Sequence, residues 1–383
     1  MMRPLKNNNR AFFALVLLCV AVPGFAIVKA IAIIMFWGYC VTIDGFERSS
    51  VIWVLSVSAN LLAWSIVAEA HMVSQTDMIN QCSRILFFFM VLSIGAHVAR
   101  SSRPRTVELD TLILRVAVLA MILKIVILTL VLGGWYSLEE IQKYVGFETV
   151  SDFIGLGLQR LQFPSDIVIL FLLPCYVGGK NRIKDAVFLV SITIVVLLSF
   201  SRFLFGGYLL CLVVRYVWIR RMDMISRFSV VVILVLCTIF SASLAVRFSG
   251  EGTTASDNTR AEQIRHLDSA ISSYPILGTG IGSSASGYTR SETMPFSYEV
   301  EWYALTMQFG FLGIAWFCIN LIAVLFVSLK AGKQVLPFAI VFVVWIASGF
   351  TNPYVTSLGS AFGFSILMLR TLQNESTNDR IRA

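Results

Sequence analysis

The sequence predicts an all-α integral membrane protein whose chain crosses the membrane about twelve times. Hydrophobic residues make up 57% of the 383 residues, charged residues make up only 14%, and the mean hydropathy is +0.80. A soluble chain would carry about a quarter charged residues. Apolar runs near span length recur along the chain, so the membrane is the expected solvent for most of it. We therefore expect residues 1–383 to form a single membrane domain.

The apolar runs give the positions of the predicted spans. They lie at 11–23, 25–43, 51–69, 84–99, 112–132, 165–179, 185–200, 202–218, 228–246, 301–328, 334–350 and 354–371. The first two runs are together too long for one span of about 20 residues. Pro23 and Gly24 supply a break between them, because both disfavour a continuing helix. Further spans follow at once, so the first run is a retained helix rather than a signal peptide.

The lysines and arginines set the expected direction of the spans. With the N-terminus inside, nineteen of these cations fall in inside segments and eight in outside segments. This asymmetry is the positive-inside bias of membrane proteins, and it places both termini in the cytoplasm. The formal net charge of +8 is then mainly a topology signal, which argues against nucleic-acid binding.

Two longer segments are expected on the outer side, at 133–164 and 247–298. The second is the largest polar stretch of the chain, and we expect it to form a lid over a functional site at the outer surface of the membrane. Within it, 256–258 (Ser-Asp-Asn) predicts a helix cap. The proline after Tyr274 predicts that this helix ends at about Ser273.

One face of the predicted lid helix combines a cation with apolar residues. The residues that share this face by helical spacing are Arg260, Ile264, Leu267 and Ile271. Arg260 should therefore point toward protein or membrane. Arg265 lies off this face, where Glu262 can pair with it.

Arg202 follows Ser201 at the outer junction of two predicted spans that have almost no loop between them. A cation there has little water of its own, so we expect it to face a polar cavity or an anionic group. The alternative is that its side chain reaches out to lipid phosphate.

Two acids stand at the outer mouth of the span that begins near residue 301. If the helix already includes Glu299, then Glu299 and Glu301 point about 200° apart and cannot line one pocket. Glu299 would then share a face with Trp302, Tyr303 and Thr306. A Glu-x-Glu metal site would need extended backbone, and we expect no metal.

Glycines are dense in 275–284, where the backbone can approach a ligand closely and offer N–H groups to phosphate. No Walker motif is present, and an ordinary glycine-rich turn is the favoured alternative. The seven cysteines are scattered without metal or redox spacing, so no disulfide is expected.

The order of these parts resembles the bacterial O-antigen polymerase and ligase superfamily, over roughly residues 155 to 371. The parts are Ser201-Arg202, Arg260 early in a long outer loop, Pro275-x-x-Gly278-x-Gly280, a polar residue eleven before Gly310-Phe311-Leu312-Gly313, and Asn352-Pro353-Tyr354. In the ligases the position eleven before the first glycine of the later motif resembles a His-Asn pair. This chain has Glu299-Val300 there, which favours a polymerase.

The resemblance implies a glycosyltransferase of the C type in the bacterial inner membrane, with no metal and no other cofactor. Its donor would be a glycan on undecaprenyl diphosphate, handled at the periplasmic face. A polymerase transfers the growing chain to the next lipid-linked unit, and a ligase transfers it to lipid A-core. Membrane lipid is the expected surrounding, and a chain-length regulator protein is a further partner that the resemblance would allow.

The resemblance also gives expected roles to the outer side chains. Arg202 and Arg260 would hold the diphosphate through paired hydrogen bonds. Glu299 would accept a proton from the attacking hydroxyl or orient it. The weaker candidates for substrate contact are Arg160, Arg265, Tyr274 and Arg290.

A polysaccharide or lipid transporter is the alternative from another class. Transporters place ionisable residues near the middle of the membrane. Lys124 is the main such residue, with Lys29 nearer the end of a span, and there is no clear internal repeat. Surface chemistry is therefore the favoured reading.

Overall fold

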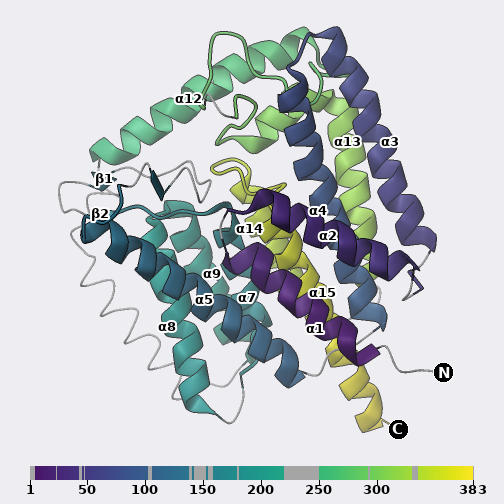
Figure 1. Ribbon diagram of the computed structural model, residues 1–383, viewed down its shortest axis with the longest axis vertical. Coiled ribbons are helices and arrows are strands. Elements are labelled where there is room, and N and C mark those ends of the chain that lie inside the picture. The colour runs from purple at the N-terminus through teal and green to yellow at the C-terminus, as the bar shows by residue number, and fades with distance from the viewer. Residues whose placement is uncertain are drawn as a thin grey trace.

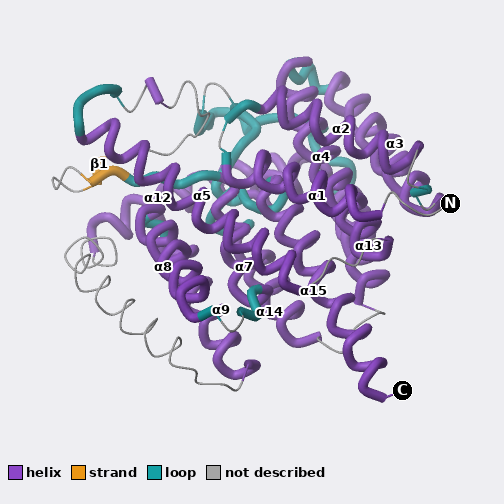
Figure 2. The backbone as a smooth tube through the Cα atoms, turned by 60° about the horizontal axis from the view of Figure 1, so that its bottom comes forward, coloured by secondary structure: helices purple, strands orange, loops and turns teal. Residues whose placement is uncertain are grey.

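The predicted spans become helices in the computed structural model, because a backbone within an apolar run must satisfy its own hydrogen bonds. The structure describes residues 5–22, 24–42, 45–46, 48–101, 106–137, 140–141, 152–153, 158–178, 181–219, 250–291, 294–329 and 335–382. Most of the described chain is helical (Figure 2). Each predicted span within these residues corresponds to a helix. The predicted span 228–246 lies outside the described residues.

The elements follow one another along the chain in a simple order (Figure 1). They are α1 (Leu5–Val16), the π-helical turn η1 (Leu17–Ala21), α2 (Ala26–Thr42), α3 (Arg48–Ala70), α4 (Gln75–Ser101), α5 (Thr106–Leu132), β1 (Asp152–Phe153), β2 (Leu158–Gln159), the 3-10 turn η2 (Pro164–Ile167), α7 (Val168–Cys175), α8 (Arg182–Ser199), α9 (Arg202–Ile219), α12 (Gly250–Ser273), α13 (Glu301–Leu329), α14 (Val335–Ser348) and α15 (Leu358–Arg382). The two strands pair antiparallel over two residues each.

Four of the described helices are long and apolar enough to cross a membrane. They contain Ser50–Ala70, Gln75–Ser101, Val107–Leu132 and Glu301–Ala323. The other apolar helices are shorter. The chain therefore has the character of a membrane protein, while a count of twelve crossings stays a prediction.

The predicted break between the first two spans is confirmed. The chain leaves η1 after Ala21 and re-enters a helix at Ala26. Gly24 and Phe25 between them have φ angles of 75° and 52°. Both angles lie in the left-handed region, which ends a right-handed helix, and a residue without Cβ adopts it at little cost.

The helices form a bundle with α12 lying across one end of it (Figure 1). In the bundle, α15 packs against α4 and α7, and α5 packs against α8. The start of α1 and the end of α15 lie at the end of the bundle away from α12. The two ends of the described chain thus share one side, opposite the helix predicted to form the lid.

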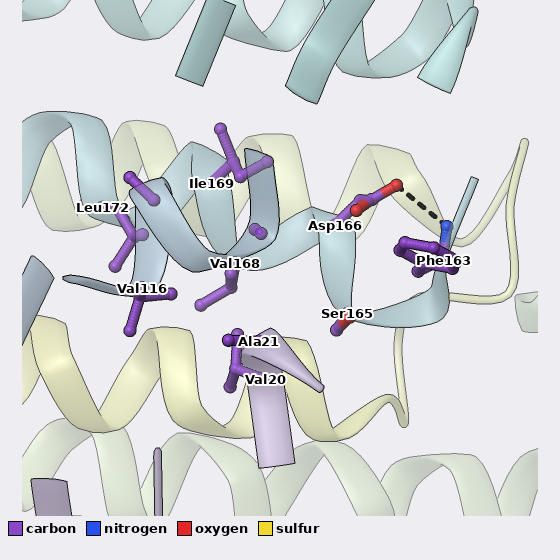
Figure 3. Close-up of a pocket in the computed structure, with 11 residues that line it drawn as sticks. Val20, Ala21, Val116, Phe163, Ser165, Asp166, Val168, Ile169 and Leu172 are labelled. Carbon is purple, nitrogen blue, oxygen red and sulfur yellow. Dashed lines mark hydrogen bonds between the residues drawn. The ribbon is translucent and has the colours of Figure 1, made fainter. Parts of the chain in front are cut away.

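Lys124 is the buried cation that the sequence placed within a span. Its side chain is fully buried, and its Nζ lies 2.7 Å from Asp166 Oδ2 and 2.6 Å from the carbonyl oxygen of Leu161. Asp166 also accepts the backbone N–H of Phe163 at 2.9 Å (Figure 3). A buried charge needs such partners, because an unpaired ion in an apolar interior costs several kcal/mol. This lysine thus fixes the segment 160–166 against α5.

Helix α13 is sharply kinked at Gly310, whose backbone angles are φ 61° and ψ −178°. The kink separates a first part, 301–309, from a second part, 311–329. The ring of Trp302 in the first part lies 6.2 Å from the ring of Phe317 in the second. The second part alone is about 28 Å long at 1.5 Å per residue. That length matches the roughly 30 Å thickness of the hydrocarbon core.

Candidate active site

Helix α12 is the helix predicted to form the lid, and it begins earlier than predicted. It starts at Gly250, so the predicted cap at 256–258 is wrong and these residues lie inside the helix. Residues of this type favour caps when their side chains bond to the local backbone. The carboxylate of Asp257 instead contacts arginines. The predicted end of the helix is confirmed, because α12 ends at Ser273.

The predicted inward face of α12 is confirmed. Leu267 is fully buried, Ile271 is 9% exposed, and both pack against the first part of α13. The side chain of Arg260 on the same face is only 19% exposed. The packing of Leu267 and Ile271 against α13 therefore positions the guanidinium group of Arg260 at the end of the bundle.

Arg202 and Arg260 meet at one oxygen atom. The Oδ1 atom of Asp257 accepts a hydrogen bond from Arg202 Nη2 at 2.9 Å and another from Arg260 Nη1 at 3.1 Å. The side chain of Asp257 is 56% exposed, whereas those of the arginines are 21% and 19% exposed. We call these three residues the latch, because they join the lid to the first residue of α9. The expectation that Arg202 faces an anionic group is confirmed.

Glu299 lies on the other side of Arg260. Its Oε2 atom is 3.0 Å from Arg260 Nε, and its Oε1 atom is 3.4 Å from Arg290 Nη2. Glu299 Oε2 and Arg260 Nε form an ion pair that is not aligned as a hydrogen bond. Both atoms are buried, and neither has a hydrogen-bond partner in the part of the chain that the structure describes. Gln263 fixes the backbone here by accepting the N–H of Glu299 at 2.9 Å.

The cluster therefore joins three arginines to two acids. Arg202, Arg260 and Arg290 contribute three positive charges, and Asp257 and Glu299 contribute two negative charges. One positive charge remains. Guanidinium groups arranged in this way match the oxygens of phosphate groups.

Arg160 reaches the same end of the bundle from the segment before η2. Its Nε donates to the carbonyl of Ser199 at 3.3 Å, and its Nη2 donates to Gln162. Gln162 in turn donates to Asn352 Oδ1 at 3.1 Å and to the hydroxyl of Tyr354. No local pattern in the sequence marks Gln162, because Asn352 and Tyr354, to which its amide donates, lie 190 and 192 residues away.

The loop before α15 links this polar group to the latch. Arg260 Nη2 donates to the carbonyl of Thr351 at 3.4 Å, next to the buried Asn352. Of the predicted site residues, Arg160, Arg202, Arg260, Arg290 and Glu299 are therefore joined by a chain of contacts.

Two other predicted site residues lie apart from this cluster. Arg265 is exposed, and its Nη2 contacts His266 Nε2 at 3.2 Å. The ring of Tyr274 lies against His71 at 4.6 Å, beyond the carboxyl end of α12. Fourteen residues separate Arg260 from Tyr274, or about 21 Å along a helix. The structure thus does not bring Arg265 or Tyr274 to the latch.

The two acids before and at the start of α13 have separate roles, and the condition under which Glu299 would share a helical face with Trp302 is not met. Helix α13 begins at Glu301, so Glu299 precedes it and does not share a helical face with Trp302. Glu301 is 4% exposed, and its carboxylate contacts Arg84 Nη2 at 3.0 Å. It also accepts the N–H of Val355 at 2.5 Å and both the N–H and the hydroxyl of Thr356. This carboxylate holds the fold together beneath the site.

The glycine-rich segment is a structural turn, as the favoured alternative predicted. The N–H groups of Thr279 and Gly280 donate to the carbonyls of Met307 and Gln308 at 2.8 and 2.9 Å. A Cβ at Gly278 would lie 2.5 Å from the backbone of Gly310. These amides are already used, so they do not form a phosphate cradle. We call Pro275–Gly280, together with 301–310 of α13, the anchor.

Tyr298 stabilises the loop between the anchor's two parts. Its hydroxyl accepts the N–H of Ala285 at 2.8 Å and donates to the carbonyl of Tyr288 at 3.3 Å. Burial raises the pKa of the Tyr298 phenol, so it stays protonated and can donate.

An apolar cavity near Asp166 is separate from the cluster (Figure 3). It has a volume of about 10 Å³, and its lining includes Val20, Val116 and Leu172. That volume is at most enough for one water molecule, so the cavity cannot hold a sugar or a diphosphate. Among the described residues, no group of three or more His, Cys, Asp or Glu side chains could hold a metal ion, and the described cysteines are free thiols.

Comparison with known proteins adds no relative. A scan against protein-family models, a search of curated proteins and a search of solved structures each gave no match.

Proposed function

We propose that this chain is a glycosyltransferase that needs no metal and polymerises oligosaccharide units carried on undecaprenyl diphosphate. The observation that carries the proposal is the latch, where arginines from α9 and α12 converge on one carboxylate oxygen beside Glu299. Such a site suits a substrate that brings a strong anion and a hydroxyl group to the same place. O-antigen or a related surface polysaccharide would be the product.

The diphosphate takes the place of Asp257 between the two arginines. Asp257 is the most exposed member of the latch, so an arriving anion meets it first. A diphosphate carries more charge than one carboxylate, and it offers oxygens on two phosphorus atoms to two guanidinium groups. Arg202 and Arg260 would then stabilise the charge that develops on the leaving group.

Glu299 acts on the acceptor. An acceptor hydroxyl oxygen attacks the anomeric carbon of the donor glycan, and its proton passes to the carboxylate. The bond from that carbon to the diphosphate oxygen breaks, and undecaprenyl diphosphate leaves with the electron pair. Ion pairs with Arg260 and Arg290 hold the Glu299 carboxylate in position beside the latch. Such a base contributes on the order of 10²–10⁴-fold.

Arg160 and Arg290 contact the glycan or the phosphates from the two flanks of the latch. Arg290 is linked to the latch by its ion pair with Glu299. Arg160 is linked to it by hydrogen bonds through the buried Gln162 and Asn352. Buried amides next to an arginine suit sugar hydroxyl groups, because both donors and acceptors are present.

The topology follows from the same proposal. The chain crosses the bacterial inner membrane about twelve times with both termini in the cytoplasm, and α12 lies on the periplasmic side. The positive-inside bias supports this direction. The start of α1 and the end of α15 also lie away from α12 (Figure 1). Membrane lipid surrounds the bundle, and a chain-length regulator protein would be an additional partner.

The direct test uses purified protein in liposomes with lipid-linked repeat units and without ATP or divalent metal. The wild-type chain should form long glycans on undecaprenyl diphosphate. Arg202→Ala and Glu299→Ala should each lower the rate about 10²-fold or more, since one preorganised donor or base contributes that much. Arg265→Ala, an exposed arginine on the same lid, is the matched control and should keep the rate.

Several results would overturn the proposal. Full-length glycan from Arg202→Ala and Glu299→Ala would remove the site assignment. Loss of activity on chelation, restored by added metal, would contradict the metal-free reaction. Transfer to lipid A-core in place of the next repeat unit would identify a ligase.

A further inference from the structure

An exposed apolar corner lies where the lid segment meets the kink of α13. Ile276 is 68% exposed and Leu277 is 47% exposed, and both follow the end of α12. Phe311 and Leu312, just past the kink, are 62% and 54% exposed. Four large apolar side chains at neighbouring positions are unusual on a surface in contact with water.

Backbone hydrogen bonds hold these four residues together. The N–H of Phe311 donates to the carbonyl of Pro275 at 2.8 Å, and the N–H of Leu312 donates to the carbonyl of Ile276 at 3.2 Å. The indole N–H of Trp64 donates to the carbonyls of Leu277 and Phe309, each at 3.0 Å. The kink frees the N–H groups of Phe311 and Leu312 and the carbonyl of Phe309 from the helix, and groups elsewhere in the protein satisfy them again. The backbone carbonyls of Pro275, Ile276 and Leu277 are thus turned toward protein donors, and the exposed surface of the corner is formed by the side chains.

The position along two helices gives the depth of the corner. Trp64 lies six residues before the end of α3 at Ala70, or about 9 Å along its axis. The second part of α13 begins at Phe311, and its length of about 28 Å would fill the hydrocarbon core. Both estimates place the corner just inside the outer boundary of the hydrocarbon.

The corner also continues an exposed apolar face of α13. Ile319 is 65% exposed and Ile322 is 51% exposed. Separations of seven residues, from Leu312 to Ile319, and of eleven, from Phe311 to Ile322, return to nearly the same side of a helix. The four residues at the corner are therefore the outer end of one apolar face.

We propose that this corner, formed by Ile276, Leu277, Phe311 and Leu312, is embedded among the acyl chains of the outer leaflet of the bilayer. The segment after α12 is then not wholly in the periplasm, and the carboxyl end of the lid is anchored in lipid. Moving these apolar side chains from water into acyl chains stabilises the anchored state. This inference does not depend on the proposed reaction.

The test measures the surroundings of a spin label in lipid nanodiscs. Labels are placed singly by Ile276→Cys and by Leu312→Cys, and the signal of the unsubstituted chain is subtracted. Both labels should be relaxed more strongly by oxygen, which partitions into acyl chains, than by a water-soluble nickel chelate. Ser272→Cys, exposed on α12 within two residues of its end, is the control and should show the opposite preference.

Either of two results would overturn the proposal. Relaxation of the Ile276 label by nickel as strong as that of the Ser272 label would place the corner in water. Protection from both reagents would mean that another protein or a second copy covers it. Ile276→Trp in nanodiscs with brominated acyl chains is an independent check, since added fluorescence that bromine fails to quench would also contradict lipid contact.

Discussion

The latch and the anchor hold the same lid in different ways. At the latch, α12 is held by ion pairs of Asp257, a residue that is more than half exposed. At the anchor, the chain is held by backbone hydrogen bonds around Gly310 and by the buried carboxylate of Glu301. One end depends on charge in contact with water, and the other depends on groups shielded from it.

The difference indicates which end of the lid can open. Exposed ion pairs contribute about 0–1 kcal/mol each, and salt screens them. Breaking a buried ion pair by removing one partner costs about 3–5 kcal/mol. The lid should therefore open at the latch and turn about the anchor. In this way an anionic substrate could enter between Arg202 and Arg260 without unfolding the end of the bundle.

The largest expected effect comes from two acids that are two residues apart. Glu301→Gln should lower the free energy of unfolding by about 3 kcal/mol, because it leaves the N–H groups of Val355 and Thr356 and the guanidinium of Arg84 poorly matched. Glu299→Gln should lower it by about 1 kcal/mol or less, since its ion pairs are partly exposed. Unfolding of both variants in a denaturing detergent series measures the difference, and equal losses would contradict the distinction between the buried carboxylate of the anchor and the partly exposed carboxylate beside the latch.

A smaller loss of stability is expected from Gly310→Ala. The φ angle of 61° disfavours any residue with a Cβ, and that Cβ would lie 2.2 Å from the carbonyl oxygen of Ile276. Backbone strain of this kind costs about 1–3 kcal/mol. Faster hydrogen exchange at Phe311 and Leu312 should accompany the loss.

Gly38→Ala is the matched control for the kink. A Cβ at Gly38 meets nothing within 4 Å, so this variant should keep or slightly raise stability. Wild-type stability and exchange in Gly310→Ala would show that the kink does not fix the anchor.

The smallest change in stability is expected from Asp257→Asn. Removing the charge should cost less than about 1 kcal/mol, because the carboxylate is exposed. It should at the same time raise the affinity for a short polyprenyl diphosphate several-fold, because the ligand no longer competes with a carboxylate for both arginines. Titration at low salt measures this affinity.

Asp268→Asn is the control for the latch. Asp268 is exposed on α12, eleven residues or about three turns beyond Asp257. This variant should bind the diphosphate as the wild type does. Weaker binding by Asp257→Asn would mean that Asp257 belongs to the ligand site itself and does not merely occupy it.

Local patterns in the sequence predicted much of the fold. Apolar runs gave the helices, and helical spacing gave the inward face of α12 with Arg260 on it. The isolation of Arg202 between two spans predicted that it faces a polar cavity or an anionic group, and it faces the carboxylate of Asp257. Each of these inferences depends only on residues that are close together in the chain.

The features that the sequence did not predict depend on distant residues. Glu301 and Arg84 are 217 residues apart, and Gln162 and Asn352 are 190 residues apart. No spacing rule in a single sequence joins such pairs. The local pattern around Asp257 fits a helix cap, while its partner Arg202 lies 55 residues earlier. Gly310 lies within one apolar run, so hydropathy alone does not reveal the kink.

The pairing of Lys124 with Asp166 has a consequence for how the chain enters the membrane during synthesis. The lysine is made 42 residues before its partner, so the whole of α5 is complete while this charge is still unpaired. A lysine at the centre of an inserting helix costs roughly 2.5–3.5 kcal/mol. Helix α5 has a mean hydropathy of 2.6, the highest of the four long apolar helices, and this offsets the charge until Asp166 emerges. Of the four long apolar helices, the most apolar one is thus the one that waits for its counter-ion.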